Sequence, residues 1–264
     1  MLTGVWENEY GSRLTVRVVG NRMAGEYQST TGSTGRYLIS GWCGAESLVP
    51  GCGRPIALAI SWRSIDPGDY DDSWRFASSL GGQMIDVDGK PALVLNHLLV
   101  APVPFAVLCE PGVYTDKLMY RKVGDAVPSD DVELLTSPRL DQAIAGAWRA
   151  NDGTLLDLRT ETDVRHGTGV ISGSLVLGGL RRQVAGFFDR QDPARACDRQ
   201  SVAIAALDKG GATPLGLSGW LDRDGDVMDL HMAANRRTDL GSIYLQTALS
   251  VLRFRRDGAD RVIR

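Results

Sequence analysis

The stretch Leu2-Thr3-Gly4-Val5-Trp6, followed by Gly11-Ser12-Arg13-Leu14-Thr15, decides the fold because the chain repeats it. The second copy reads Ile144-Ala145-Gly146-Ala147-Trp148, followed by Gly153-Thr154-Leu155-Leu156-Asp157. In each copy a Gly-x-Trp segment leads into a turn and then into a strand of alternating hydrophobicity. The copies lie roughly 140 residues apart, so each is the size of a whole barrel rather than of one solenoid repeat.

Short strands separated by turns account for the first copy. Gly, Asn and Pro punctuate the sequence at short intervals, a spacing typical of an antiparallel sandwich or barrel. Closing such a sheet removes its exposed edges, which favours a barrel. After the opening strand we predict strands at residues 13–19, 25–31, 36–41, 56–62, 73–80, 92–100 and 117–123.

The repeat divides the chain into two domains. Residues 1–124 form the first unit, which holds the candidate ligand pocket, and residues 141–256 form the second, divergent unit. The linker, residues 125–140, contains Pro128 and Pro138, which break regular structure, and has room for a short helix at 132–135. Residues 257–264 are a polar tail.

The overall composition is that of an ordinary globular protein. The 264 residues are 43% hydrophobic, and the formal net charge is −3. A negative net charge offers no basic field for nucleic acid, so we expect no such partner. No apolar run approaches the roughly 20 residues of a transmembrane helix, and no signal-like segment opens the sequence. We therefore expect no membrane partner and a cytoplasmic location, or secretion if a leader peptide has been removed.

The four cysteines do not have the spacing of a metal site. Cys43 and Cys52 flank a short loop and can form a disulfide if their Cα atoms approach within about 7 Å. Scattered cysteines in a chain of this length are more often free thiols. No Cys-x-x-Cys or His-x-x-x-His pattern occurs, so we predict neither a metal nor a cofactor.

The motifs of residues 1–124 resemble the avidin and streptavidin family. The opening segment with Gly11-Ser12 is similar to the family's first strand and turn, and the later segments follow in the family's order: Gly25-Glu26-Tyr27-Gln28-Ser29, Arg36-Tyr37-Leu38-Ile39-Ser40-Gly41, Ile60-Ser61-Trp62 and Ser73-Trp74. The resemblance implies an all-β chain of two eight-stranded antiparallel up-and-down barrels, packed as a pseudo-dimer. A barrel of this size has room for one small ligand, and the family's usual ligand is biotin.

The resemblance also implies a set of ligand-binding residues. Asn8, Ser12 and Tyr27 match the three donors to the ureido oxygen of biotin, and Ser29 matches the acceptor for one ureido N–H. Convergent donors of this kind favour a polarised carbonyl oxygen. In the alternative interpretation these side chains only satisfy one another at the barrel mouth. The remaining matches are the loop residues Thr31 and Ser33 and the apolar wall residues Trp62, Trp74 and Leu99.

Three departures from the family pattern affect the expected ligand. His97 stands where the family has a third pocket tryptophan, and Asp72 places a carboxylate near the position of the ligand's sulfur. Leu118 aligns with the family's last-strand aspartate, and Asp116 lies two residues earlier. We therefore do not expect very tight binding of biotin.

The second copy lacks the polar residues of the first. Ala150 replaces the asparagine and Leu175 replaces the tyrosine. Such an apolar interior either fills its own barrel, which we favour, or admits a lipid-like guest. The other pocket positions of this copy are Leu177, Leu207, Leu217 and Met232.

Three functions are compatible with these residues. The first is a protein that binds biotin or a biotin-like carbonyl or urea compound in the first barrel. The second is a cofactor-independent cyclase, isomerase or lyase in which His97 acts as acid and base, Asp72 orients it, and the Asn8/Ser12/Tyr27 group stabilises an oxyanion. The third is an assembly protein with vestigial pockets. We favour the first, with a small-molecule partner, and two chains can pair into a homodimer of pseudo-dimers.

Overall fold

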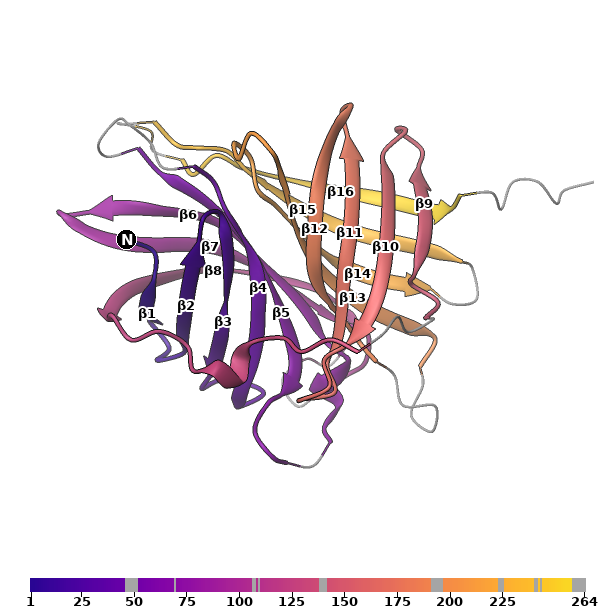
Figure 1. Ribbon diagram of the computed structural model, residues 1–264, viewed down its shortest axis with the longest axis horizontal. Helices are drawn as coiled ribbons and strands as arrows, with labels where there is room; N and C mark the ends of the chain where they lie inside the picture. Colours follow the sequence, from indigo (N-terminus) through magenta and orange to yellow (C-terminus); the bar gives the residue numbers. More distant parts are fainter. Residues whose placement is uncertain are drawn as a thin grey trace, which may run out of the picture.

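Two closed antiparallel barrels lie side by side in one chain, as predicted (Figure 1). The computed structural model describes residues 1–45, 52–68, 70–105, 108, 110–137, 142–190, 197–222, 226–239, 242 and 244–257. In each barrel every strand pairs with its neighbours in sequence, and the first strand pairs with the last to close the sheet.

The first barrel consists of strands β1 to β8. Their bounds are β1 Gly4–Asn8, β2 Arg13–Val19, β3 Arg22–Ser29, β4 Gly35–Cys43, β5 Arg54–Ser64, β6 Ala77–Val87, β7 Lys90–Ala101 and β8 Gly112–Gly124. The second barrel repeats this arrangement with β9 Gly146–Ala150, β10 Leu155–Thr162, β11 Gly169–Leu177, β12 Leu180–Phe188, β13 Arg199–Asp208, β14 Leu215–Asp222, β15 Val227–Asn235 and β16 Thr247–Arg256.

The repeated Gly-x-Trp motif performs the same structural task in both barrels. Trp6 and Trp148 are completely buried, each inside its own hydrophobic core. The indole Nε1 of Trp6 donates to the carbonyl oxygen of Leu2 (2.8 Å), and that of Trp148 donates to Ile144 (3.0 Å). The large rings can therefore be buried without leaving an indole N–H unpaired.

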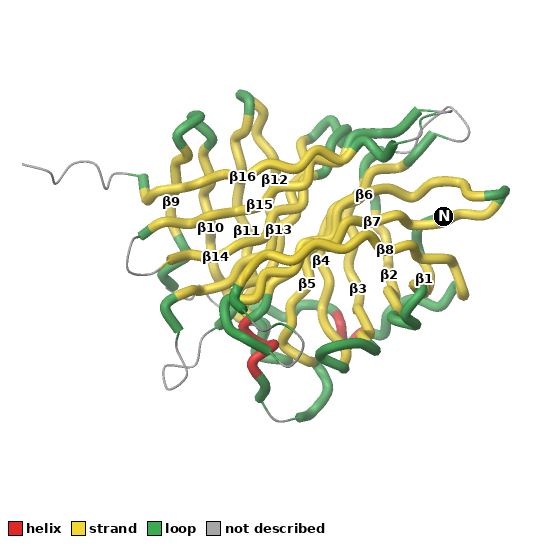
Figure 2. Tube along the Cα trace, turned by 180° about the vertical axis from the view of Figure 1, so that it is seen from behind, coloured by secondary structure: helices red, strands yellow, loops and turns green. Residues whose placement is uncertain are grey.

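Helical structure in the described chain is limited to two short 3₁₀ turns, drawn in red in Figure 2. The turn η1, Asp72–Arg75, occupies the start of the strand predicted at 73–80, which begins only at Ala77. Asp71 caps this turn because its carboxylate accepts from the backbone N–H of Ser73 (2.8 Å). The turn η2, Asp130–Val132, lies earlier than the helix predicted at 132–135. No helix in the described part of the chain is long and apolar enough to span a membrane.

The alternative of a disulfide between Cys43 and Cys52 is not realised. Cys43 is buried at the end of β4, where its thiol donates to the carbonyl oxygen of Asn21 (3.6 Å), and no disulfide joins it to Cys52. Cys109 lies outside the described residues.

The two barrels pack through the outer faces of β4 to β7 and of β12 to β15, which confirms the pseudo-dimer. Small side chains such as Ala59, Ala77 and Ala203 share this interface with Leu38 and Phe187. A Cβ atom added at Gly81 would lie 2.9 Å from Asn235 of the other barrel. Small residues therefore set how closely the two sheets approach.

Several hydrogen bonds tie the barrels together where the surfaces are polar. The hydroxyls of Ser79 and Ser218 lie 3.1 Å apart. The completely buried amide of Gln83 donates from Nε2 to the carbonyl oxygen of Arg236 (2.8 Å) and accepts from the backbone N–H of Thr238 (2.9 Å). Gln83 therefore pairs backbone groups that would otherwise be buried without partners.

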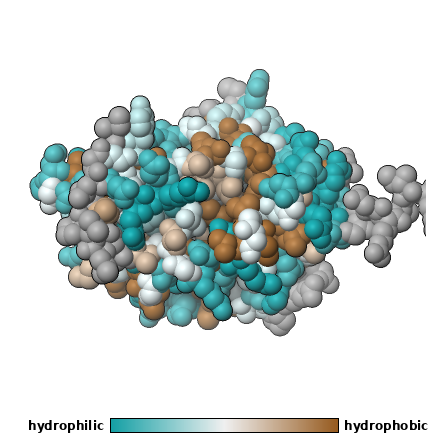
Figure 3. Space-filling view, turned by 90° about the horizontal axis from the view of Figure 1, so that it is seen from above, coloured by the Kyte–Doolittle hydropathy of each residue, from teal (hydrophilic) through white to brown (hydrophobic). Residues whose placement is uncertain are grey.

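The outer surface of β16 carries exposed apolar side chains. Leu249 is 60% exposed and Val251 is 58% exposed, whereas Leu252 and Phe254 point into the second core. A hydrophobic patch is visible among hydrophilic side chains on the face seen from above (Figure 3). Pairing of two chains into a homodimer stays a prediction.

Replacing Gln83 by methionine keeps the volume of the side chain and removes its hydrogen bonds to the second barrel. Because a buried N–H of Thr238 is then left unpaired, we expect the free energy of unfolding to fall by about 2–3 kcal/mol. The control is Gln28→Met at an exposed position on β3. Equal unfolding curves for the two variants in urea would contradict this account of the interface.

Candidate functional site

The mouth of the first barrel holds a cavity of about 390 Å³. Most of the predicted ligand-binding residues line it: Asn8, Tyr27, Ser29, Thr31, Ser33, Trp62, His97 and Leu99. Phe76, Phe105, Leu108 and Leu118 complete the apolar wall, and Asp116 supplies one carboxylate. The cavity is within the size range of sites for small organic ligands.

Asn8 presents its amide nitrogen as a donor. Its Oδ1 accepts from the backbone N–H groups of Tyr10 (3.0 Å) and Ser12 (2.9 Å) in the turn that follows β1. Because only an oxygen can accept these two bonds, the orientation of the amide is fixed, and Nδ2 remains as a donor.

Tyr27 and Tyr120 place two phenol groups beside Asn8. Tyr27 lines the cavity from β3, and its hydroxyl lies near those of Ser12, Ser29 and Tyr120. Burial raises the pKa of both phenols, that of Tyr120 well above its usual value, so both stay protonated at neutral pH. The hydroxyl of Tyr120 is completely buried and lies near Asn8 and Tyr27, with no hydrogen bond of regular geometry to a described residue.

Ser29 and Ser12 differ in what they can offer to a ligand. Ser29 donates its proton to the carbonyl oxygen of Thr31 (2.9 Å), so its Oγ can accept a further hydrogen bond. Thr30 donates its hydroxyl proton to the carbonyl oxygen of Tyr10 (2.9 Å), so the 3.0 Å bond between the Thr30 and Ser12 hydroxyls must be donated by Ser12. Ser12 thus joins two loops and is not a donor to the cavity.

We call Asn8, Tyr27, Tyr120 and Ser29 the polar cradle. Asn8 and Tyr27 present donors to the cavity and Ser29 presents an acceptor, whereas Tyr120 lies behind this lining, against Asn8 and Tyr27. The sequence signal for Tyr120 is its alternation with Leu118 along β8, which turns both residues into the barrel.

Hydrogen bonds hold the loop between β3 and β4 in place at one side of the cavity. Ser33 is buried, and its hydroxyl lies 2.8 Å from that of Tyr37 and 2.7 Å from that of Ser73. Ser73 in turn bonds the carboxylate of Asp71. Ser33 therefore links this loop to η1, and Thr31 lies on the cavity side of the same loop.

Trp62 and His97 form one wall and share a hydrogen-bond partner. Trp62 Nε1 donates to Ser78 Oγ (2.7 Å), and His97 Nε2 lies 2.9 Å from the same oxygen. The two rings are nearly parallel, with centroids 6.4 Å apart. Burial lowers the pKa of His97 to about 4, with Asp116 opposing this shift. His97 is therefore neutral at physiological pH.

Asp72 and Trp74 are not part of this site. The Asp72 side chain is 56% exposed and faces Arg75 at 3.8 Å, and Trp74 lines a different cavity, between the barrels. Both lie in η1 rather than in a strand, so neither reaches the position in the pocket that the resemblance implied. The carboxylate beside His97 belongs to Asp116, which pairs with it in the register of β7 and β8.

The interior of the second barrel is lined by buried apolar side chains. Ala150, Leu175, Leu217 and Met232 are buried in its core, and Leu177 packs against them. Leu207 is also buried. At the positions equivalent to Tyr27 and Ser29 on β3, the second barrel has Leu175 and Leu177 on β11. The polar cradle therefore has no counterpart at these positions.

Comparison of the chain with protein-family models and with curated proteins finds no match. The resemblance to the avidin family therefore stays a prediction from the sequence motifs.

The lowered pKa of His97 predicts how stability changes with pH. An unperturbed histidine has a pKa of about 6.5, so between pH 6.5 and 4 the unfolded chain binds more protons than the folded one. The free energy of unfolding therefore falls as the pH falls through this window. We expect His97 alone to account for a loss of about 2 kcal/mol between pH 7 and pH 5. Urea unfolding at both pH values measures the loss, and His97→Gln is the control because it removes the titration. An equal loss in both proteins would contradict the prediction.

Proposed function

We propose that the first barrel binds a small ligand with a carbonyl or urea group, biotin or a compound similar to it. The observation that carries this proposal is the convergence of two donors on the cavity, Asn8 Nδ2 and the hydroxyl of Tyr27, with the acceptor Ser29 beside them. A urea presents one oxygen that accepts and N–H groups that donate, which is the complement of this arrangement.

The hydroxyl of Tyr120 supports the donors from behind. It is completely buried, lies near Asn8 and Tyr27, and is not among the residues that line the cavity. Tyr120 is therefore expected to act on a ligand through these two neighbours, by holding their polar groups in place.

The walls of the cavity favour a ligand with an apolar, flat body. Trp62, Phe76 and Phe105 surround it with aromatic rings, and Leu99 and Leu118 fill the remaining wall. Asp116 lines the same cavity and repels a negative charge. A neutral derivative of biotin should therefore bind better than biotin with its free carboxylate.

Two features weigh against the enzyme alternative. Asp72 lies away from His97 and cannot orient it, and the ring nitrogen of His97 is already engaged with Ser78, which also binds Trp62. His97 thus supports the indole wall. Asp116 is the carboxylate that an enzyme mechanism would have to use instead.

Calorimetric titration with biotin and with biotin methyl ester tests the proposal. We expect one site per chain and tighter binding of the ester. Asn8→Asp keeps the oxygen that accepts from Tyr10 and Ser12 but replaces the donor with a carboxylate oxygen, so affinity should fall by a factor of about 100 or more. Tyr27→Phe and Tyr120→Phe should each lower it about tenfold.

Tyr114→Phe is the matched control for the two phenol variants. Its hydroxyl donates to the carbonyl oxygen of Glu110 outside the cavity (2.5 Å), so affinity should not change. Undiminished binding in Asn8→Asp would contradict the proposed orientation of the ligand. No heat with either compound at high micromolar concentration would overturn the proposal.

A further inference from the structure

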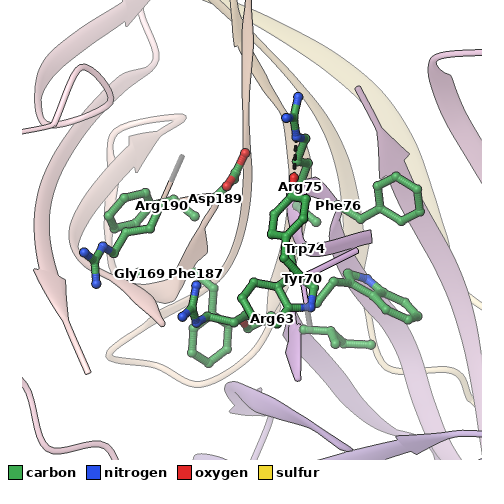
Figure 4. Close-up of a pocket in the computed structure, with 14 residues that line it drawn as sticks. Arg63, Tyr70, Trp74, Arg75, Phe76, Gly169, Phe187, Asp189 and Arg190 are labelled. Carbon is green, nitrogen blue, oxygen red and sulfur yellow. Dashed lines mark hydrogen bonds between the residues drawn. The ribbon is translucent and has the colours of Figure 1, made fainter. Parts of the chain in front are cut away.

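A second cavity, of about 260 Å³, lies between the two barrels (Figure 4). We call it the seam cavity. The first barrel contributes the end of β5, η1 and the start of β6, and the second contributes Gly169 with the end of β12 and Asp189 and Arg190 beyond it. Neither barrel alone has both walls, so the cavity exists only because the two copies are packed together.

Positive charge dominates the lining of the seam cavity. Arg63, Arg75 and Arg190 line it, and Asp189 is the one acid among the described residues that do so. Because Arg75 is paired with Asp72 (3.8 Å), Arg63 and Arg190 against Asp189 leave an excess of one positive charge, in a protein whose formal net charge is −3. The excess is therefore a local feature and not a reflection of the overall composition.

A hydrogen bond and a ring contact hold the guanidinium group of Arg63 at the seam cavity. Its Nε donates to the carbonyl oxygen of His166 (2.8 Å), and its guanidinium carbon lies 4.3 Å from the centre of the Trp74 ring. None of the ion pairs between described residues involves Arg63. Burial and the neighbouring charge of Arg190 lower its pKa, and the carboxylate of Asp189 opposes this shift. A half-buried cation beside a second cation is stabilised by an anion placed between them.

Aromatic rings provide the rest of the wall. Tyr70 and Trp74 meet edge to face with centroids 5.3 Å apart, and Tyr70 accepts a hydrogen bond from Arg75 Nε (2.6 Å). Phe187 lies across the cavity on the second barrel (Figure 4). At roughly 30 Å³ per water molecule, the 260 Å³ of the seam cavity correspond to about nine waters. A ligand with a similar number of non-hydrogen atoms is one aromatic ring with a small substituent.

We propose that the seam cavity binds a small planar organic anion, such as a carboxylate on a single aromatic ring. The carboxylate lies between Arg63 and Arg190, where planar guanidinium groups bind it with paired N–H donors. The ring lies against Trp74 and Phe187. This site is independent of the polar cradle and gives the second barrel a role in binding although its own interior is apolar.

Titration of the full chain with benzoate tests the proposal. We expect one benzoate per chain, an affinity that falls with rising salt, and binding of benzamide at least tenfold weaker. Arg63→Gln and Arg190→Gln should each lower the affinity for benzoate about tenfold or more. To the described residues Arg190 makes a single long hydrogen bond, to the carbonyl oxygen of Gly167 (3.3 Å), so its replacement should leave folding intact even if that of Arg63 does not.

Arg253→Gln is the matched control because it removes the same charge from an exposed ion pair with Asp229 on the outer surface. It should leave benzoate binding unchanged, as should Asn8→Asp in the other cavity. The proposal is overturned if no benzoate binds at millimolar concentration, if benzamide binds equally well, or if Arg190→Gln and Arg253→Gln behave alike.

Discussion

A closed sheet of eight strands determines which side chains can meet in this protein. Because each strand pairs on both sides, every residue points either into the barrel or away from it, and successive residues alternate. On β3 this alternation turns Tyr27 and Ser29 inward, and on β11 it turns Leu175 and Leu177 to the equivalent places. The same backbone therefore forms a cavity with polar lining residues in one copy and an apolar core in the other.

The outward residues are as important as the inward ones, because the two barrels meet through them. Ala59, Ala77 and Ala203 allow the sheets to approach, and Gln83 pairs backbone groups of the second barrel. The surface of the second barrel supplies Phe187 and Arg190 to the seam cavity, which the first barrel completes with Arg63 and Trp74.

The two cavities are neighbours and share part of their walls. Trp62 and Phe76 line both of them. Their chemical character nevertheless differs: the barrel mouth offers neutral donors and one carboxylate, whereas the seam offers guanidinium groups. The first arrangement complements a neutral carbonyl compound and the second an anion, so the charges on the two linings separate the two ligand classes.

The sequence by itself determined the features that depend on local alternation: two barrels of short strands, the inward positions of Asn8, Tyr27 and Ser29, and the apolar interior of the second copy. The tertiary structure decided the features that depend on register across strands and on loop geometry. Tyr120 joins the polar cradle because closure brings β8 beside β1, and Asp116 lies opposite His97 because of the pairing of β7 with β8. Asp72 and Trp74 leave the site because Asp71 caps a 3₁₀ turn. The seam cavity required the packing of two sheets whose contacting residues are far apart in the chain, and no pattern within either copy records that packing.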